Sequence, residues 1–94
     1  MNTPQTTPVI SSETSSAIER LYEVVLHNDD VNPMDHVVVS LMRVFGHTVE
    51  IAVRVMLEAH YRGQAVAEVE AETPARAHRD QLQSLGLIAT IHPV

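Results

Sequence analysis

The sequence contains no cysteine and no tryptophan. Without thiols the chain cannot form a disulfide, a thiolate metal site or a cysteine nucleophile, and this favours a reducing compartment, so we expect a cytoplasmic protein. Aromatic residues make up only 3% of the chain, although 45% of it is hydrophobic. We therefore expect an aliphatic core with few large rings. The available rings are Tyr22, Phe45 and Tyr61.

Basic residues are scarce as well. Six Lys and Arg stand against twelve Asp and Glu, which gives a net charge of −6. Because no Lys/Arg-rich run is present, we expect neither nucleic-acid nor anionic-membrane binding, but a cationic or neutral partner. No stretch approaches the roughly 18 uninterrupted apolar residues of a membrane span, and the beginning of the chain lacks the apolar region of a secretory signal.

The length of 94 residues leaves room for one domain. Residues 1–20 are dominated by Thr, Ser, Pro and Gln, and this composition predicts a flexible tail. Residues 21–94 then form the folded domain, which we expect to be a monomer.

Local signals predict three strands and three helices in the order β-α-α-β-α-β. Asn32 before Pro33 is typical of an N-cap with proline at the first helical position, and Thr48 and Thr73-Pro74 mark two further helix starts. Glycines mark the helix ends. The predicted strands are 21–26, 65–71 and 87–91, and the predicted helices end before Gly46, Gly63 and Gly86. This order predicts an α+β fold, a small three-stranded antiparallel sheet packed against three helices on one face.

Two groups of side chains could form a site. Asn28, Asp29 and Asp30 follow the first strand and make an acceptor cluster suited to an ammonium group or a metal, although such residues are also ordinary in turns. His60 lies one helical turn after Met56, beside an apolar stripe, where a histidine is commonly a packing residue. An EF-hand loop does not fit this turn, and the remaining histidines lack the spacing of a zinc site, so we predict no metal. No catalytic motif is present, and we do not expect an enzyme.

Two stretches of the sequence resemble one family. Leu21 to Met34, LYEVVLHNDDVNPM, resembles the opening strand and N-D-D-x-x-P-M turn of the ClpS adaptor family. Met56 to Gly63, MLEAHYRG, resembles the M-L-x-x-H-x-x-G helix end of that family. The resemblance covers about residues 20–92, with both motifs in order and in the predicted structural contexts.

The resemblance implies an adaptor without a cofactor of its own. It would bind proteins with an exposed N-terminal Leu, Phe, Tyr or Trp and deliver them to the N-terminal domain of a Clp AAA+ unfoldase, ClpC or ClpA, for degradation by ClpP. By motif position, Asn28, Asp30 and His60 would contact the substrate's α-amino group, and Asp29 would add negative potential. The implied pocket for the first side chain is lined by Asn32, Met34, Val37, Met56, Ala59 and Leu87.

The sequence departs from the family pattern around the implied pocket. Val31 stands where an aromatic residue is common, Asn32 where Thr is common, and His27 replaces a small aliphatic residue. Ala59 stands where Val is common, which predicts a slightly roomier pocket. At the implied docking site for the unfoldase, Thr73 and His78 replace the Glu and Lys typical of relatives that dock on ClpA, and this favours ClpC.

Two other functions are compatible with the residues. A small α/β domain with a mobile tail also suits a protein-interaction module of the ribosomal-stalk type. A hydrolase that uses Asp29 and Asp30 has less support, because no further catalytic group is apparent in the sequence.

Overall fold

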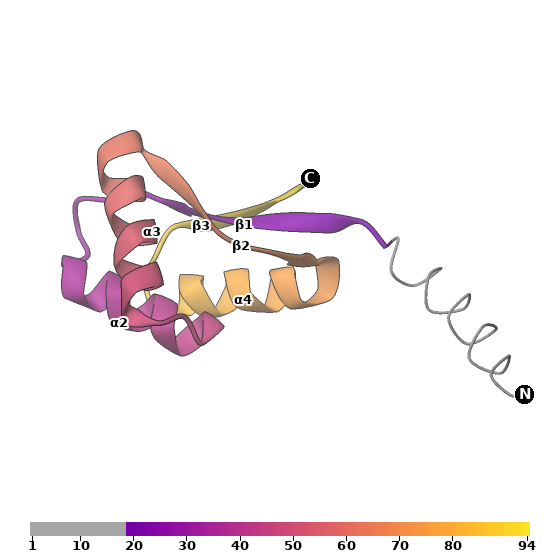
Figure 1. The fold of residues 1–94 in the computed structure, drawn as a ribbon, viewed down its shortest axis with the longest axis horizontal. Helices are drawn as coiled ribbons and strands as arrows, with labels where there is room; N and C mark the ends of the chain where they lie inside the picture. Colours follow the sequence, from indigo (N-terminus) through magenta and orange to yellow (C-terminus); the bar gives the residue numbers. More distant parts are fainter. Residues whose placement is uncertain (1–18) are drawn as a thin grey trace, which may run out of the picture.

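The computed structural model describes residues 19–94. The predicted tail of residues 1–20 lies outside this range except for its last two residues, so its flexibility stays a prediction. The elements follow the predicted order (Figure 1). They are β1 (Leu21–His27), α2 (Met34–Phe45), α3 (Val49–Arg62), β2 (Gln64–Ala71), α4 (Glu72–Ser84) and β3 (Ala89–Pro93).

The three strands form one antiparallel sheet in the order β2-β1-β3. The central place of β1 follows from its sequence, since Val24, Val25 and Leu26 are all buried, with at most 2% of their surface exposed. Helix α4 lies along one face of the sheet and contacts all three strands (Figure 1). Helix α3 contacts β1 and β2, and α2 packs on α3 and α4. The predicted fold class is confirmed.

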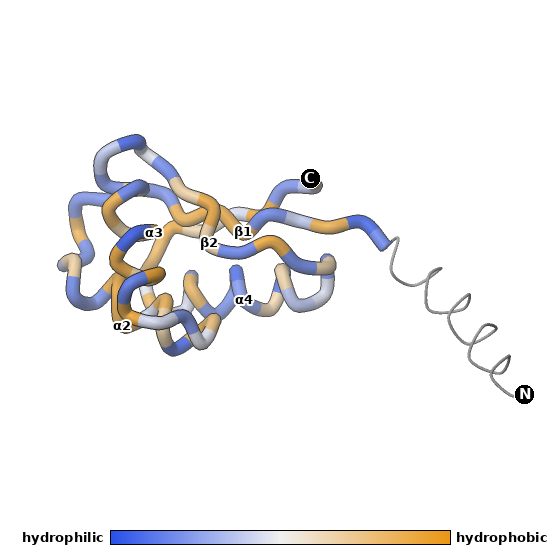
Figure 2. The backbone as a smooth tube through the Cα atoms, in the orientation of Figure 1, coloured by the Kyte–Doolittle hydropathy of each residue, from blue (hydrophilic) through white to orange (hydrophobic). Residues whose placement is uncertain are grey.

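Small aliphatic side chains build the core between the sheet and the helices. Hydrophobic stretches of β1, β2 and α3 alternate with hydrophilic ones along the chain, as the half-buried elements of a small domain require (Figure 2). The buried cluster consists of Val24, Leu26, Leu41, Ala52, Val55, Met56, Ala59, Ala65, Ala67, Ala75, Leu82, Leu87 and Ala89. Tyr22 and Phe45 pack against it, whereas Tyr61 is 78% exposed and is not the core residue that we expected.

Several predicted helix ends are confirmed by the backbone. Gly46 and Gly63 follow α2 and α3 in the left-handed conformation, with φ of 73° and 93°, which a residue without Cβ adopts easily. The Thr48 hydroxyl caps α3 by accepting a hydrogen bond from the Ile51 N–H at 3.3 Å.

Two helix starts and one strand differ from the prediction. Pro33 itself is the N-cap of α2, and Asn32 lies outside the helix, because its side chain is bonded to other groups. Helix α4 begins at Glu72, so Pro74 lies within the first turn, where a missing N–H costs nothing. Strand β3 begins at Ala89, because the Leu87 N–H still bonds to the carbonyl of Leu82 at 3.1 Å.

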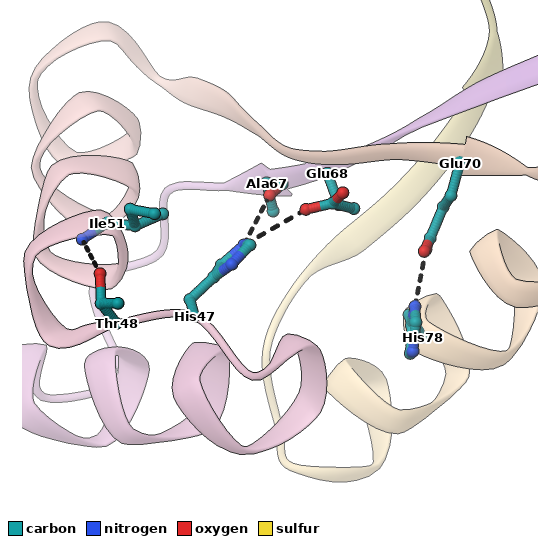
Figure 3. Close-up of polar contacts among 7 residues, drawn as sticks. All are labelled: His47, Thr48, Ile51, Ala67, Glu68, Glu70 and His78. Atoms are coloured by element: carbon teal, nitrogen blue, oxygen red, sulfur yellow. Dashed lines mark hydrogen bonds and ion pairs between the residues drawn. The ribbon is translucent and has the colours of Figure 1, made fainter.

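A β-bulge interrupts the pairing of β1 with β2. The register shifts between Val24 and Val25, where Ala67 is an extra residue on β2. The Ala67 carbonyl accepts a hydrogen bond from His47 Nε2 at 2.8 Å, and the Glu68 carboxylate lies 3.6 Å from the same nitrogen (Figure 3). The loop between α2 and α3 is thereby attached to the sheet.

A second histidine joins α4 to the same strand. His78 Nδ1 lies 2.6 Å from the Glu70 carboxylate (Figure 3). The Phe45 ring is stacked on His47, with the ring centroids 5.0 Å apart, and meets the His78 ring edge to face at 4.9 Å. The end of α2 is therefore packed between two histidines that each reach β2.

Candidate functional site

The ends of β1 and α3 meet at one place in the fold. Gly63 ends α3, and its carbonyl accepts a hydrogen bond from the Asn28 N–H at 3.0 Å. The preceding N–H, that of His27, bonds to the carbonyl of Ile88 at 2.9 Å. These two bonds fix the loop that follows β1 between the end of α3 and the start of β3. The two sequence motifs, one around Asn28 and one around His60, are therefore adjacent in space.

A pocket of about 40 Å³ opens at this junction. It exceeds the roughly 10–15 Å³ that a single water requires. Its lining combines apolar side chains with polar groups from the β1–α2 loop and the end of α3. The lining residues are Leu26, His27, Asn28, Asp29, Asn32, Met34, Val37, Met56, Ala59 and His60.

The apolar part of the pocket is contributed by three elements. Leu26, Met56 and Ala59 are buried, at 2%, 9% and 3% exposure, and belong to the core. Met34, in the first turn of α2, is 47% exposed. The floor of the pocket is thus rigid core, whereas Met34 provides a flexible thioether at the surface.

The polar part of the pocket contains two of the three residues expected to contact the amino group, together with Asp29, which was expected to add negative potential. Asn28, Asp29 and His60 line the pocket, whereas Asp30 is exposed and is not among the lining residues. The His60 ring meets the Tyr61 ring edge to face, with the centroids 4.9 Å apart. An amide oxygen, a carboxylate and a neutral imidazole nitrogen are all acceptors, and together they match the donors of an ammonium group.

Hydrogen bonds from its own loop hold the Asp29 carboxylate. Its Oδ1 accepts from the N–H groups of Val31 at 2.9 Å and of Asn32 at 2.7 Å, and its Oδ2 accepts from the Asn32 amide at 3.1 Å. Partial burial opposes ionisation, but these hydrogen bonds and the nearby His36 outweigh it, and the pKa of the Asp29 carboxyl lies below its ordinary value. Asp29 therefore carries a negative charge at neutral pH.

Most of the predicted pocket residues are brought together. Asn32, Met34, Val37, Met56 and Ala59 all line the pocket. Leu87 is not among the lining residues; it is 4% exposed and packs in the core cluster.

Two of the lining residues, Leu26 and His27, were not predicted to line the pocket. The period of two along a strand was the available signal for Leu26, because it places Leu26 on the same face as Val24, which packs in the core cluster.

The two residues expected to dock the unfoldase lie apart on α4. Thr73 is exposed in the first turn. The His78 side chain is only 25% exposed and bonded to Glu70. Five positions along a helix correspond to a rotation of about 140° around its axis, so the two side chains do not share a face.

Within residues 19–94, no three His, Asp or Glu side chains are arranged so that they could hold a metal ion. None of the helices in that range is long and apolar enough to span a membrane.

Comparison with known proteins gives consistent matches. A family model described as ATP-dependent Clp protease adaptor protein ClpS matches residues 17–90. The chain is 43% identical to the ATP-dependent Clp protease adapter protein CLPS1, chloroplastic, of Arabidopsis thaliana, over 95% of this chain and 59% of that protein. It is 42% identical to ClpS of Synechococcus elongatus over 85% of each. The chain thus spans less than two thirds of the Arabidopsis relative.

A solved structure shares the fold. Agrobacterium tumefaciens ClpS2 bound to L-phenylalaninamide superimposes with a TM-score of 0.71 and 34% identity, over 80% of this chain and 98% of that one. The two motifs, the order of the elements and the match over residues 17–90 all indicate the same family. This chain belongs to the ClpS family of Clp protease adaptor proteins.

Proposed function

We propose that the chain binds the first residue of a polypeptide, with its free α-amino group at Asn28, Asp29 and His60 and its side chain in the apolar pocket. The observation that supports this most directly is the meeting of these acceptors with the pocket formed by Met34, Met56 and their neighbours. An α-ammonium group offers three donors and one positive charge, which ionised Asp29 complements. L-Phenylalaninamide, found in the ClpS2 structure, has a free α-amino group next to an apolar side chain.

The side chains that such a pocket accepts are large and unbranched at Cβ. Leu, Phe, Tyr and Trp fit this description, whereas Val and Ile would place a second branch against Met34 at the pocket's surface. Asp30, exposed outside the lining, contributes negative potential at longer range. This exchanges the roles that the sequence analysis assigned to Asp29 and Asp30.

The bound protein is then delivered to the N-terminal domain of a Clp AAA+ unfoldase, and this chain itself cleaves nothing. Family membership supports an adaptor function over the ribosomal-stalk alternative. Thr73, exposed at the start of α4, is available for docking, and the departure from Glu and Lys at the implied contacts favours ClpC over ClpA.

A reconstituted degradation assay tests this function. Two reporter proteins that differ only in their first residue, Leu or Val, are incubated with ClpP, with ClpC or ClpA, and with or without this chain. We expect this chain to accelerate degradation of the Leu reporter alone, and only with an unfoldase that it binds in a pull-down. Equal rates for the two reporters with both unfoldases would contradict the proposal.

A further inference from the structure

The Asn32 side chain connects two loops that are distant in the sequence. Its Nδ2 donates hydrogen bonds to Asp29 Oδ2 at 3.1 Å and to the carbonyl of Gly86 at 2.8 Å, and it also lies 3.3 Å from Asp29 Oδ1. Asp29 lies in the loop after β1, and Gly86 lies in the turn between α4 and β3. One amide group therefore holds the pocket loop against a turn 54 positions further along the chain.

We propose that Asn32 is a positioning residue for the amine site: it holds the Asp29 carboxylate at the pocket and attaches the pocket loop to the α4–β3 turn. The inference rests on the proposed function, because it assigns Asn32 a role in binding through Asp29. It goes beyond the two roles expected from the sequence, which were a helix cap and a lining residue of the pocket.

The surroundings of Asp29 explain why a positioning residue is needed there. The loop from Asn28 to Pro33 has no regular secondary structure, so packing alone does not orient its side chains. A carboxylate that is ordered before the ligand arrives loses less conformational entropy on binding an ammonium group than a freely rotating one. The hydrogen bonds from Asn32 and Val31 supply that order and also favour the charged form.

A second contact supports the attachment of the loop to the turn. His36, on α2, donates a hydrogen bond from Nε2 to the carbonyl of Leu85 at 2.8 Å. Since a carbonyl only accepts, Nε2 of this ring carries a proton. Asn32 and His36 thus hold consecutive carbonyls of the same turn, those of Gly86 and Leu85.

The titratable groups near Asp29 come from β1, α2, α3 and the loop itself, and His27 lines the same pocket from the end of β1. His36 faces it from α2 and favours its charged form, His60 lines the same pocket from α3, and Asp30 follows it in the loop. The α4–β3 turn contributes backbone carbonyls. Because peptide binding involves other groups besides Asp29, the Asp29 carboxyl has to be followed by itself.

The test uses the full chain with Asn32→Ala and two measurements. A ¹³C-carboxyl NMR titration follows Asp29 in the free protein, and we expect its pKa to rise towards the ordinary value once the amide is lost. Affinity for a Leu-initiated peptide at pH 7.5 should fall about three- to tenfold, because the carboxylate is no longer held.

Gln83→Ala is the matched control. Gln83 Nε2 donates to the carbonyl of Ala89 at 2.9 Å, on the same connection between α4 and β3, and Gln83 does not line the pocket. We expect this variant to keep the wild-type affinity and the wild-type Asp29 titration. An equal loss of affinity in Gln83→Ala and Asn32→Ala would show that any loosening of this connection is sufficient, and would overturn the proposal.

The remaining outcomes separate this inference from the proposed function. Wild-type protein that binds the peptide no better than its α-acetylated form would contradict the proposed function, and the inference would fall with it. In a second outcome, wild-type protein requires the free amine but Asn32→Ala binds the peptide with unchanged affinity. This result would overturn the inference and leave the proposed function intact, whatever the carboxyl titration shows.

Discussion

At the scale of residues, the site combines side chains that are held by the fold with exposed ones, namely Asn28, Met34 and His60. Asp29 is bonded to its own loop, and Met56 and Ala59 are part of the core. Met34 is half exposed at the start of α2. The Asp29 carboxylate is therefore held in place before a ligand binds. The fit of the ligand's first side chain depends on Met34, which can adopt several rotamers.

The lowered pKa of Asp29 predicts a pH-dependent contribution to stability. Because the folded-state pKa lies below the ordinary value of 3.8, the contribution is present in full above that value and is lost as the pH falls through the lowered pKa. Asp29→Asn should therefore reduce the free energy of unfolding at pH 7, and the difference from wild type should shrink in acid. Urea unfolding at pH 7 and at about pH 3 measures this.

Asp30→Asn is the control for that measurement. Asp30 is exposed and adjacent in sequence, so its substitution should change the free energy of unfolding by less than about 0.5 kcal/mol at either pH. A difference between Asp29→Asn and wild type that stays constant with pH would contradict the assigned role of the carboxylate charge.

Met34 should determine discrimination against β-branched first residues. Met34→Ala removes the side chain that a branched residue would meet, so we expect the preference for a Leu-initiated over a Val-initiated peptide to shrink about tenfold. Met42→Ala is the matched control, because Met42 lies on the same helix and does not line the pocket. Fluorescence titration of both peptides against both variants measures it, and an unchanged preference in Met34→Ala would refute the assignment.

At the scale of elements, the pocket exists because three element ends are joined by backbone hydrogen bonds. The N–H of Asn28 reaches the carbonyl of Gly63 at the end of α3, and the N–H of His27 reaches Ile88 before β3. Gly63 therefore ends a helix and also holds the polar loop. Gly46 ends α2 in the same left-handed conformation but lies away from the pocket lining.

This difference between the two glycines is testable. No heavy atom lies within 4 Å of a Cβ added at either position, so alanine there introduces backbone strain without a clash. Both Gly63→Ala and Gly46→Ala should cost about 1–2 kcal/mol of unfolding free energy, since φ is positive at each. Only Gly63→Ala should also weaken peptide binding. Thermal unfolding and peptide titration check the two effects, and equal affinity in the two variants would be inconsistent with the account.

The elements could be predicted wherever a local interaction determines them. Thr48 caps α3 and Gly46 ends α2 as expected, because both depend on neighbouring backbone groups. Asn32 is a residue type that is common at helix N-caps. Its side chain instead donates a hydrogen bond to the carbonyl of Gly86, which is distant in sequence and close only in the folded structure. In the same way, the α4–β3 turn bonds to the helix end, so β3 begins later than its apolar residues suggested.

At the scale of the whole molecule, a short acidic chain builds a small pocket from an almost purely aliphatic core. The expected pocket residues from Asn28 to His60 come together because the two motifs lie on elements that the sheet brings side by side. Leu87 and Asp30 lie outside the lining, because the side a residue faces depends on packing that sequence spacing does not reveal. Tyr61 illustrates the same limit, since it was expected in the core but is 78% exposed.

The central claim is that the pocket requires a free α-amino group. Calorimetric titration of the full chain with a Leu-initiated peptide and its α-acetylated twin, for wild type and His60→Ala, tests it most directly. We predict that wild type binds only the free-amine peptide and that His60→Ala weakens this binding at least about tenfold. Equal binding of the acetylated peptide by wild type would contradict the claim.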